Sequence, residues 1–167
     1  VVQHMPIAAN QMDEFLQEAG QLVIYQLRKS WLNISKLYNE LAAEHGGTMS
    51  MAFILIAIDD EDGIPVTKIA PRLGMEPNSL SRILKSMEEE EFISRDRTSN
   101  DRRMSYVKLT KKGEEMRLVA MKAVYRLEKA IVEDLSSSDL KGFFSTSSHI
   151  PEAIDKFKSR LENDNIS

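Results

Sequence analysis

The amino-acid sequence predicts a mainly α-helical fold of the α+β class, on three observations. Apolar residues recur at helical spacing in long segments near both ends of the chain. Two short helical segments in the middle are joined by a glycine-containing turn, and two alternating segments with a polar loop between them follow directly. A chain of 167 residues suits one compact unit with appended helices.

The N-terminal part predicts a tail and one long helix. We set residues 1–9 aside as a disordered tail or a remnant of cloning. Residues 10–44 contain no proline and one glycine, which predicts a single helix that ends at His45, Gly46 and Gly47. At 1.5 Å per residue such a helix spans roughly 50 Å, so part of it is expected to pack outside its own domain.

A second helix and a polar turn follow. Thr48 or Ser50 can cap an almost entirely apolar helix that reaches Ile58, and a helix of this composition is expected to be buried. The acidic residues 59–63 predict a turn. They lack the 12-residue alternation and the closing glutamate of an EF-hand loop, so we do not interpret them as a calcium site.

The first of the two short central helices lies next. Residues 64–66 are expected to be extended, because the residue before a proline avoids the α region. Thr67 offers a cap for a helix that closes at Gly74. Pro71 lies inside this helix, where its ring is least disruptive if the helix begins near Val66 or Thr67.

The second central helix and a hairpin complete the middle of the chain. Pro77 suits the first position of a helix that runs to about Glu91. Residues 92–97 and 105–110 predict two strands, joined by the polar loop 98–104. The inner face of the helix is apolar and consists of Leu80, Ile83, Leu84 and Met87.

Two helices are expected at the C-terminal end. Residues 111–135 carry apolar side chains on two faces, so two different surfaces must cover this helix. After the serines at 136–138 a final helical stretch follows, and Pro151 is expected to kink or break it.

The central segment has the order of a winged helix-turn-helix and a basic charge. The chain carries a net charge of -4, yet residues 66–112 hold 11 Lys and Arg against 7 Asp and Glu. Phosphate binding requires only a local basic face. The second short helix fits the major groove of B-DNA, and arginines at a hairpin tip suit a narrow minor groove. The candidate DNA-binding residues are Pro77, Asn78, Ser79, Ser81, Arg82 and Lys85 in the recognition helix and Asp101, Arg102 and Arg103 in the wing.

Four motifs in this segment resemble the MarR family of winged helix-turn-helix transcriptional regulators. They are residues 79–88 (SLSRILKSME), 92–95 (FISR), 101–103 (DRR) and 109–113 (LTKKG). The resemblance implies a homodimer in which residues 10–47 and 114–167 form a helical dimerisation region. It implies that residues 48–113 form the DNA-binding domain and that the dimer binds a pseudo-palindromic operator. It also implies that Asp101 braces the wing by pairing with an arginine.

The resemblance further implies that a small anionic or phenolic effector releases the DNA. The candidate effector cleft consists of Trp31, Tyr38, Met49, Met51 and Phe53. Two departures limit the comparison. Pro71 stands where relatives usually have a polar helix former, and the absence of cysteine excludes the peroxide-sensing cysteine of one branch. The three histidines are scattered, so we expect neither a metal site nor a cofactor.

Other interpretations remain open at this stage. Arg102 and Arg103 can be ordinary solvated charges, and Arg82 can pair with Glu88 or Glu89 instead of a base. The residues of the candidate cleft can equally be core or interface packing.

The leading functional interpretation is an effector-responsive repressor, and the alternative is a winged-helix adaptor that dimerises and docks partners without sequence-specific DNA binding. No apolar run approaches the roughly 20 residues of a membrane span, and no export signal is evident, so we expect a cytoplasmic protein without a membrane partner. The sequence shows no nucleophile elbow, phosphate loop or metal-spaced histidine cluster, so an enzyme is not expected.

Overall fold

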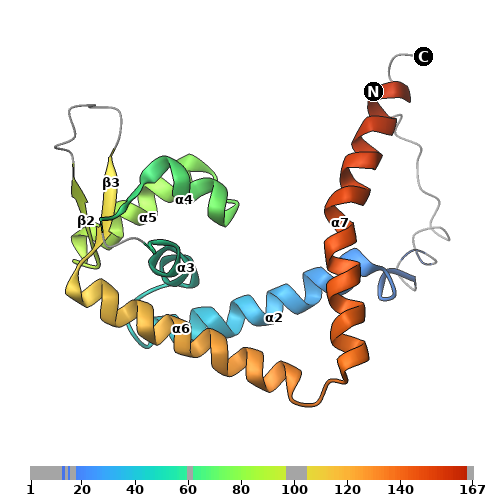
Figure 1. Cartoon of the computed structure of the whole chain (residues 1–167), viewed down its shortest axis with the longest axis horizontal. Helices are drawn as coiled ribbons and strands as arrows, with labels where there is room; N and C mark the ends of the chain where they lie inside the picture. Colours follow the sequence, from blue (N-terminus) through green and yellow to red (C-terminus); the bar gives the residue numbers. More distant parts are fainter. Residues whose placement is uncertain (1–12, 14, 16–17, 60–61, 97–104, 165–167) are drawn as a thin grey trace. The chain divides into compact units, whose positions relative to one another are not determined.

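The computed structural model describes residues 13, 15, 18–59, 62–96 and 105–164 (Figure 1). The chain divides into two compact units, Val1–Ala123 and Val124–Ser167, and each is described by itself. Residues 1–9 and the wing tip lie outside the described residues. The elements are α2 (Val23–Ala43), α3 (Met49–Ala57), β1 (Ile64–Pro65), α4 (Val66–Leu73), α5 (Pro77–Glu89), β2 (Ile93–Asp96), β3 (Tyr106–Leu109), α6 (Lys111–Val132) and α7 (Ser137–Asp164).

The prediction of one uninterrupted helix over residues 10–44 is wrong, because the chain turns immediately before α2. Gln21 N–H donates to the carbonyl of Glu18, and Leu22, which precedes the helix, has extended backbone angles. Gly20 stands in this turn, and glycine costs a helix interior about 1 kcal/mol relative to alanine. The predicted end of the helix is confirmed, since Gly46 has a φ of 73° and closes the turn after α2.

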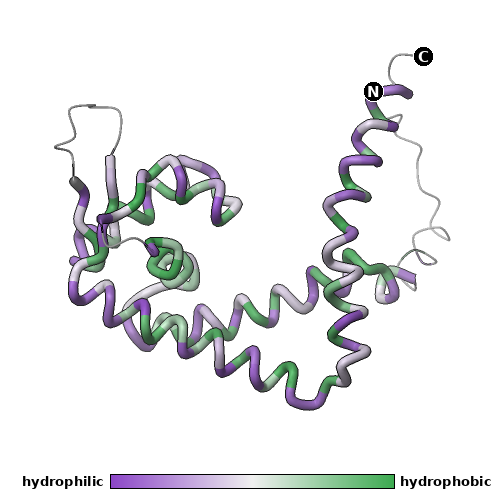
Figure 2. Tube along the Cα trace, in the orientation of Figure 1, coloured by the Kyte–Doolittle hydropathy of each residue, from purple (hydrophilic) through white to green (hydrophobic). Residues whose placement is uncertain are grey.

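The helix α3 begins at a hydroxyl cap and enters the core. The Thr48 hydroxyl accepts a hydrogen bond from Met51 N–H at 3.2 Å, so Thr48 and not Ser50 is the cap. Figure 2 shows α3 as a nearly continuous hydrophobic segment. The core joins α3, α4, α5 and the sheet, and its buried residues are Met51, Ile54, Leu55, Ile58, Ile64, Ile69, Ala70, Leu80, Leu84, Met87, Phe92, Ile93 and Val107.

The helix α4 starts directly where β1 ends. Thr67 was expected to cap it, but the residue before the first turn is Pro65, whose side chain forms no capping hydrogen bond. The helix begins at Val66, one of the two predicted starts, and Val66 N–H donates to the Ser105 carbonyl at 3.0 Å, which ties the first helical residue to the strand region. The predicted closure at Gly74 is confirmed by its φ of 60°. Pro71 is accommodated inside the helix.

A three-stranded antiparallel sheet in the order β1-β3-β2 carries the wing. The hairpin of β2 and β3 was predicted, whereas the pairing of Ile64 in β1 with Val107 in β3 was not. Gly63 precedes β1 with a φ of 84°, and a Cβ there would lie 2.6 Å from the Val107 carbonyl oxygen. Only glycine fits this close approach between the two strands.

The contacts at the junction of β3 and α6 give a physical reason for the residue types of the motif at 109–113. Thr110 N–H donates to the Phe92 carbonyl at 3.1 Å, and the Thr110 hydroxyl accepts from Gly113 N–H at 3.1 Å. A Cβ at Gly113 would lie 2.0 Å from the Phe92 carbonyl oxygen. The Lys112 ammonium stands 4.3 Å from the centre of the Phe92 ring. This junction therefore locks the first turn of α6 against the start of β2.

The two C-terminal helices differ from their predicted forms. The helix α6 ends at Val132, three residues before the predicted limit at Leu135. The predicted break at Pro151 is wrong, because α7 continues through it. A proline removes one backbone donor, and a helix of 28 residues retains its other hydrogen bonds. None of the helices in the described ranges has the length and apolar character to cross a bilayer.

Candidate nucleic-acid interface

The helix α5 has one face fixed in the core and one face in solvent. Leu80, Leu84 and Met87 are each at most 1% exposed, and Ile83 packs against the same core. The spacing of these residues turns the remaining positions outward. The predicted recognition-helix residues all lie on the exposed side, namely Pro77, Asn78, Ser79, Ser81, Arg82 and Lys85.

The start of α5 is open to a partner. Pro77 occupies the first helical position, where its missing N–H removes no helical hydrogen bond. Glu76 precedes it and forms no side-chain cap. The first-turn backbone donors near Asn78 and Ser79 therefore have no capping oxygen from Glu76, and they stand beside three exposed short polar side chains.

Two carboxylates at the end of α5 hold cationic side chains. Glu89 Oε1 lies 3.7 Å from Lys85 Nζ, one turn earlier on the same helix. Glu88 Oε2 lies 3.2 Å from Arg95 Nε, and the Arg95 side chain is only 18% exposed. Among the described residues no ion pair or hydrogen bond joins Arg82 to Glu88 or Glu89, so the open alternative of such a pair is not favoured.

The structure describes the base of the predicted wing. Asp101, Arg102 and Arg103 lie outside the described residues, and so does the expected pairing of Asp101. The strands β2 and β3 that lead into the loop are described, and Arg95 faces α5 from β2. The base of the wing is thus attached to the recognition helix by an ion pair that sequence reasoning missed.

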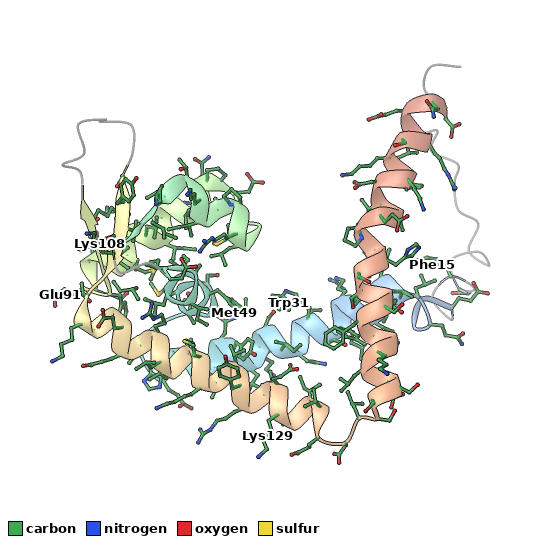
Figure 3. The ribbon with its side chains drawn as sticks, in the orientation of Figure 1. Phe15, Trp31, Met49, Glu91, Lys108 and Lys129 are labelled. Atoms are coloured by element: carbon green, nitrogen blue, oxygen red, sulfur yellow. The ribbon has the colours of Figure 1, made fainter. Side chains whose placement is uncertain are left out.

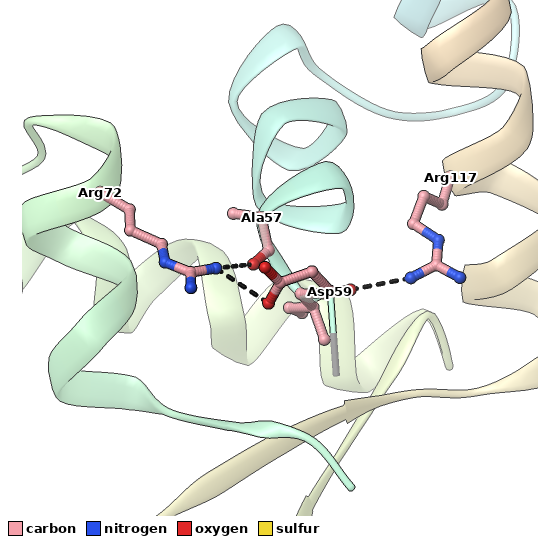
Figure 4. A network of polar contacts seen from close by, with 5 residues as sticks. Ala57, Asp59, Arg72 and Arg117 are labelled. Atoms are coloured by element: carbon pink, nitrogen blue, oxygen red, sulfur yellow. Dashed lines mark hydrogen bonds and ion pairs between the residues drawn. The ribbon is translucent and has the colours of Figure 1, made fainter. Parts of the chain in front are cut away.

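Two arginines hold the end of α3, and the sequence analysis did not anticipate them (Figure 4). Arg72 Nη1 donates to the Ala57 carbonyl and to Asp59 Oδ1, both at 2.9 Å, and Arg117 Nη1 donates to the Ile58 carbonyl at 2.9 Å. These bonds satisfy carbonyls that a helix end leaves without partners. They connect α4 and α6 to the same helix end. The sequence signal that pointed this way was the acidic turn itself, whose carboxylates can pair with a nearby cation.

The hydrogen bond from Arg72 lowers the pKa of the Asp59 carboxyl below its usual value. A carboxyl group whose pKa is lower in the folded than in the unfolded protein stabilises the fold at pH values above its unfolded pKa. This stabilisation is lost as the pH falls through the folded pKa. Both side chains are well exposed, so the effect on stability is small.

The structure brings together part of the candidate effector cleft. Trp31 and Phe53 stack with ring centroids 6.4 Å apart, and Tyr38 meets Phe53 edge-on at 6.0 Å. Figure 3 shows Trp31 on α2 and Met49 at the start of α3. Met51 is instead buried in the core beside Ile54, so its packing interpretation is favoured. Trp31 remains 51% exposed beside its ring partner.

No group of three or more His, Asp or Glu side chains that could hold a metal ion occurs among the described residues. The exposed side of α5 carries polar and cationic side chains. These can donate hydrogen bonds to base edges and to phosphate oxygens.

Comparison with known proteins agrees with the fold. The MarR family model matches residues 48–105. The transcriptional regulator SarZ of Staphylococcus epidermidis is 28% identical over 86 residues, which cover 52% of this chain, and the match spans 58% of the length of SarZ. SarZ is named as a regulator and not as an enzyme.

Two solved structures share the architecture. The repressor CouR bound to a 23-mer DNA duplex is 26% identical, with a TM-score of 0.69, and the match covers 80% of this chain and 95% of CouR. CouR from Rhodococcus jostii bound to p-coumaroyl-CoA is 15% identical, with a TM-score of 0.67, covering 79% and 93%. The residues that the family model matches, 48–105, include α3, α4, α5 and the strand β2. Residues 48–105 of this chain thus match the MarR family model, and its fold is that of the winged helix-turn-helix regulators.

Proposed function

We propose that this chain is a dimeric, DNA-binding transcription regulator that releases its operator when a small effector binds. The observation that carries the proposal is α5, which exposes Asn78, Ser79, Ser81, Arg82 and Lys85 while its apolar face is locked into the core. A helix held in this way can enter the major groove as a rigid body. The structure of CouR bound to a DNA duplex supports this role of the helix, because CouR has a similar fold.

The wing supplies the second contact in this proposal. Arg102 and Arg103 follow β2 in the sequence, and their guanidinium groups suit the negative potential of a narrow minor groove. Asp101 braces them, as the family resemblance implies. Two such units, each made of residues 48–113, then grip a pseudo-palindromic operator in successive turns of the duplex.

A second copy of the chain completes the molecule in this proposal. The helices α2 and α7 bury none of the residues the structure describes. They leave large apolar side chains exposed, and such surface on a soluble protein marks an interaction site. Apart from Trp31, those on α2 are Val23, Ile24, Tyr25, Leu27, Leu32 and Leu37, and those on α7 are Phe143, Phe144, Ile154, Phe157 and Leu161. These helices belong to the proposed dimerisation region, residues 10–47 and 114–167.

The effector is proposed to be a small anionic or phenolic molecule that packs against the aromatic cluster of Trp31, Tyr38 and Phe53. The rings at α2 and α3 lie within contact distance of one another, and the exposed half of Trp31 offers a flat apolar surface. The p-coumaroyl group of the ligand in CouR from Rhodococcus jostii is of this class. In this proposal the protein is a repressor, and binding of such a molecule releases it from the operator.

Selection of bound duplexes from a random pool tests the proposal. We expect one enriched palindrome, a protein mass of two chains in sedimentation, and weaker binding in the presence of p-coumarate together with a change in Trp31 fluorescence. Dimers that select no sequence at low salt would instead support a winged-helix adaptor that docks partners without DNA.

The Arg103→Ala variant is expected to bind the selected duplex more weakly at all salt concentrations. If Arg103 meets one phosphate, the slope of log affinity against log salt falls by roughly 0.9, because one fewer counterion is released. Fluorescence anisotropy from about 50 to 200 mM salt measures this slope. The control is Arg160→Ala on α7, an exposed arginine outside the DNA-binding residues, with sedimentation to check that the mass of two chains is retained. An unchanged slope and affinity for Arg103→Ala contradict its role.

A further inference from the structure

The cationic side chains of the winged helix-turn-helix fall into two groups. Between Val66 and Lys112 four of the described Lys and Arg residues have partners within the chain. Arg72 is held by Asp59, Lys85 by Glu89 and Arg95 by Glu88, while Lys112 donates to the Glu90 carbonyl. The side chains of four others form no hydrogen bond or ion pair in the part of the chain that the structure describes, namely those of Lys68, Arg82, Lys108 and Lys111.

Arg82 differs from the other three in position and in chemistry. It is the arginine among them, and it lies on the exposed face of α5, one turn after Asn78. A guanidinium group presents two parallel N–H donors in a fixed plane, whereas an ammonium group acts as a point charge. Lys68, Lys108 and Lys111 therefore suit phosphates, and Arg82 suits a pair of acceptors in one plane.

The neighbours of Arg82 on α5 do not compete for the same role. Lys85 would have to leave Glu89 in order to bind a base. Because this exposed ion pair is weak, it does not by itself exclude Lys85 from that role. Its ammonium donors diverge from one nitrogen, so they match two acceptors in one plane less closely than a guanidinium group does. Ser79 and Ser81 carry hydroxyls that donate and accept, so they discriminate poorly among bases.

We propose that Arg82 reads a guanine in each operator half-site by donating two hydrogen bonds to its O6 and N7 atoms. Guanine is the base that presents two acceptors side by side in the major groove. Because the Arg82 side chain has no partner among the described residues, binding guanine breaks no ion pair within them. This assignment rests on the proposed function, since it requires that α5 enters the major groove.

The test compares selected duplexes in which one guanine per half-site is replaced by adenine or by 7-deazaguanine, which lacks the N7 acceptor but still pairs with cytosine. For the unaltered protein we expect one position where each replacement weakens binding, by about 5- to 150-fold for adenine and less for 7-deazaguanine. Arg82→Ala is expected to bind the three duplexes equally. Arg82→Lys is expected to keep the salt slope and to lose most of the discrimination.

The control is Lys68→Ala, which is expected to weaken all three duplexes alike and to lower the salt slope by roughly 0.9 if Lys68 meets a phosphate. Circular dichroism melts of each variant check that the fold is retained. If the protein selects a sequence but Arg82→Ala discriminates guanine as well as the unaltered protein does, the inference is wrong and the proposed function stands. If the unaltered protein selects no sequence at low salt, the proposed function itself fails.

Discussion

Gly113→Ala is expected to destabilise the protein by about 2 kcal/mol or more, although alanine is normally the better helix former. Gly113 is the third residue of α6 and has no unusual φ, so propensity alone predicts a gain of about 1 kcal/mol. Packing decides the opposite sign. The new Cβ would lie 2.0 Å from the Phe92 carbonyl oxygen, and overpacking typically costs about 1–3 kcal/mol.

The clash at Gly113 is with backbone, which leaves no inexpensive relaxation. Phe92 cannot move away without stretching its hydrogen bond from Thr110 N–H at 3.1 Å. The measurement is thermal and urea unfolding, and a loss of 2 kcal/mol lowers Tm by roughly 4–8 °C in a protein of this size. Gly142→Ala on α7 is the matched control, since a Cβ there meets nothing within 4 Å, and a gain of about 0.5–1 kcal/mol is expected. Equal stabilisation by both substitutions would mean that the junction tolerates a side chain.

Local patterns in the sequence predicted the elements that position the candidate site. The apolar spacing of Leu80, Leu84 and Met87 assigned the inner face of α5, and the same residues are buried in the structure. Thr48 and Gly74 predicted a helix start and a helix end because capping depends on residues within one turn. These features are encoded over short distances, which is why a single sequence reveals them.

Contacts between distant residues carry no such local signal. Ile64 and Val107 are 43 positions apart, and nothing in either segment specifies that β1 joins the hairpin. The bond from Arg117 to the Ile58 carbonyl spans 59 positions and ends on a backbone atom, which every residue has. The turn at Gly20 was missed for another reason. One glycine lowers helix propensity by only about 1 kcal/mol, so the pattern alone does not decide between a weak helix and a break.

In the candidate cleft, the sequence could not predict which apolar side chains are buried in the core. Met51 and Phe53 are both apolar residues on α3, and the sequence offers no basis for separating them. The structure buries Met51 in the core and places Phe53 against Trp31 and Tyr38. A helix that is apolar on all sides conceals which side faces a neighbour, because its periodicity is lost.

The buried and exposed faces of α5 lead to the second prediction. Leu84→Ala is expected to cost about 2–5 kcal/mol of unfolding free energy, because Leu84 is 0% exposed and its removal leaves a cavity among core residues. Urea unfolding at constant pH measures this loss. The neighbouring substitution Lys85→Ala is expected to change stability by less than about 0.5 kcal/mol, since its pair with Glu89 is exposed on both sides.

The two adjacent substitutions therefore separate the scaffold from the interface within one helix. At a temperature where both variants remain folded, Lys85→Ala is expected to weaken DNA binding and to lower the salt slope. Leu84→Ala is expected to retain the slope, because it removes no charge from the exposed face. If Leu84→Ala proves as stable as the unaltered protein, the core does not hold α5 as the structure shows. The rigid presentation of Arg82 and its neighbours would then lose its physical basis.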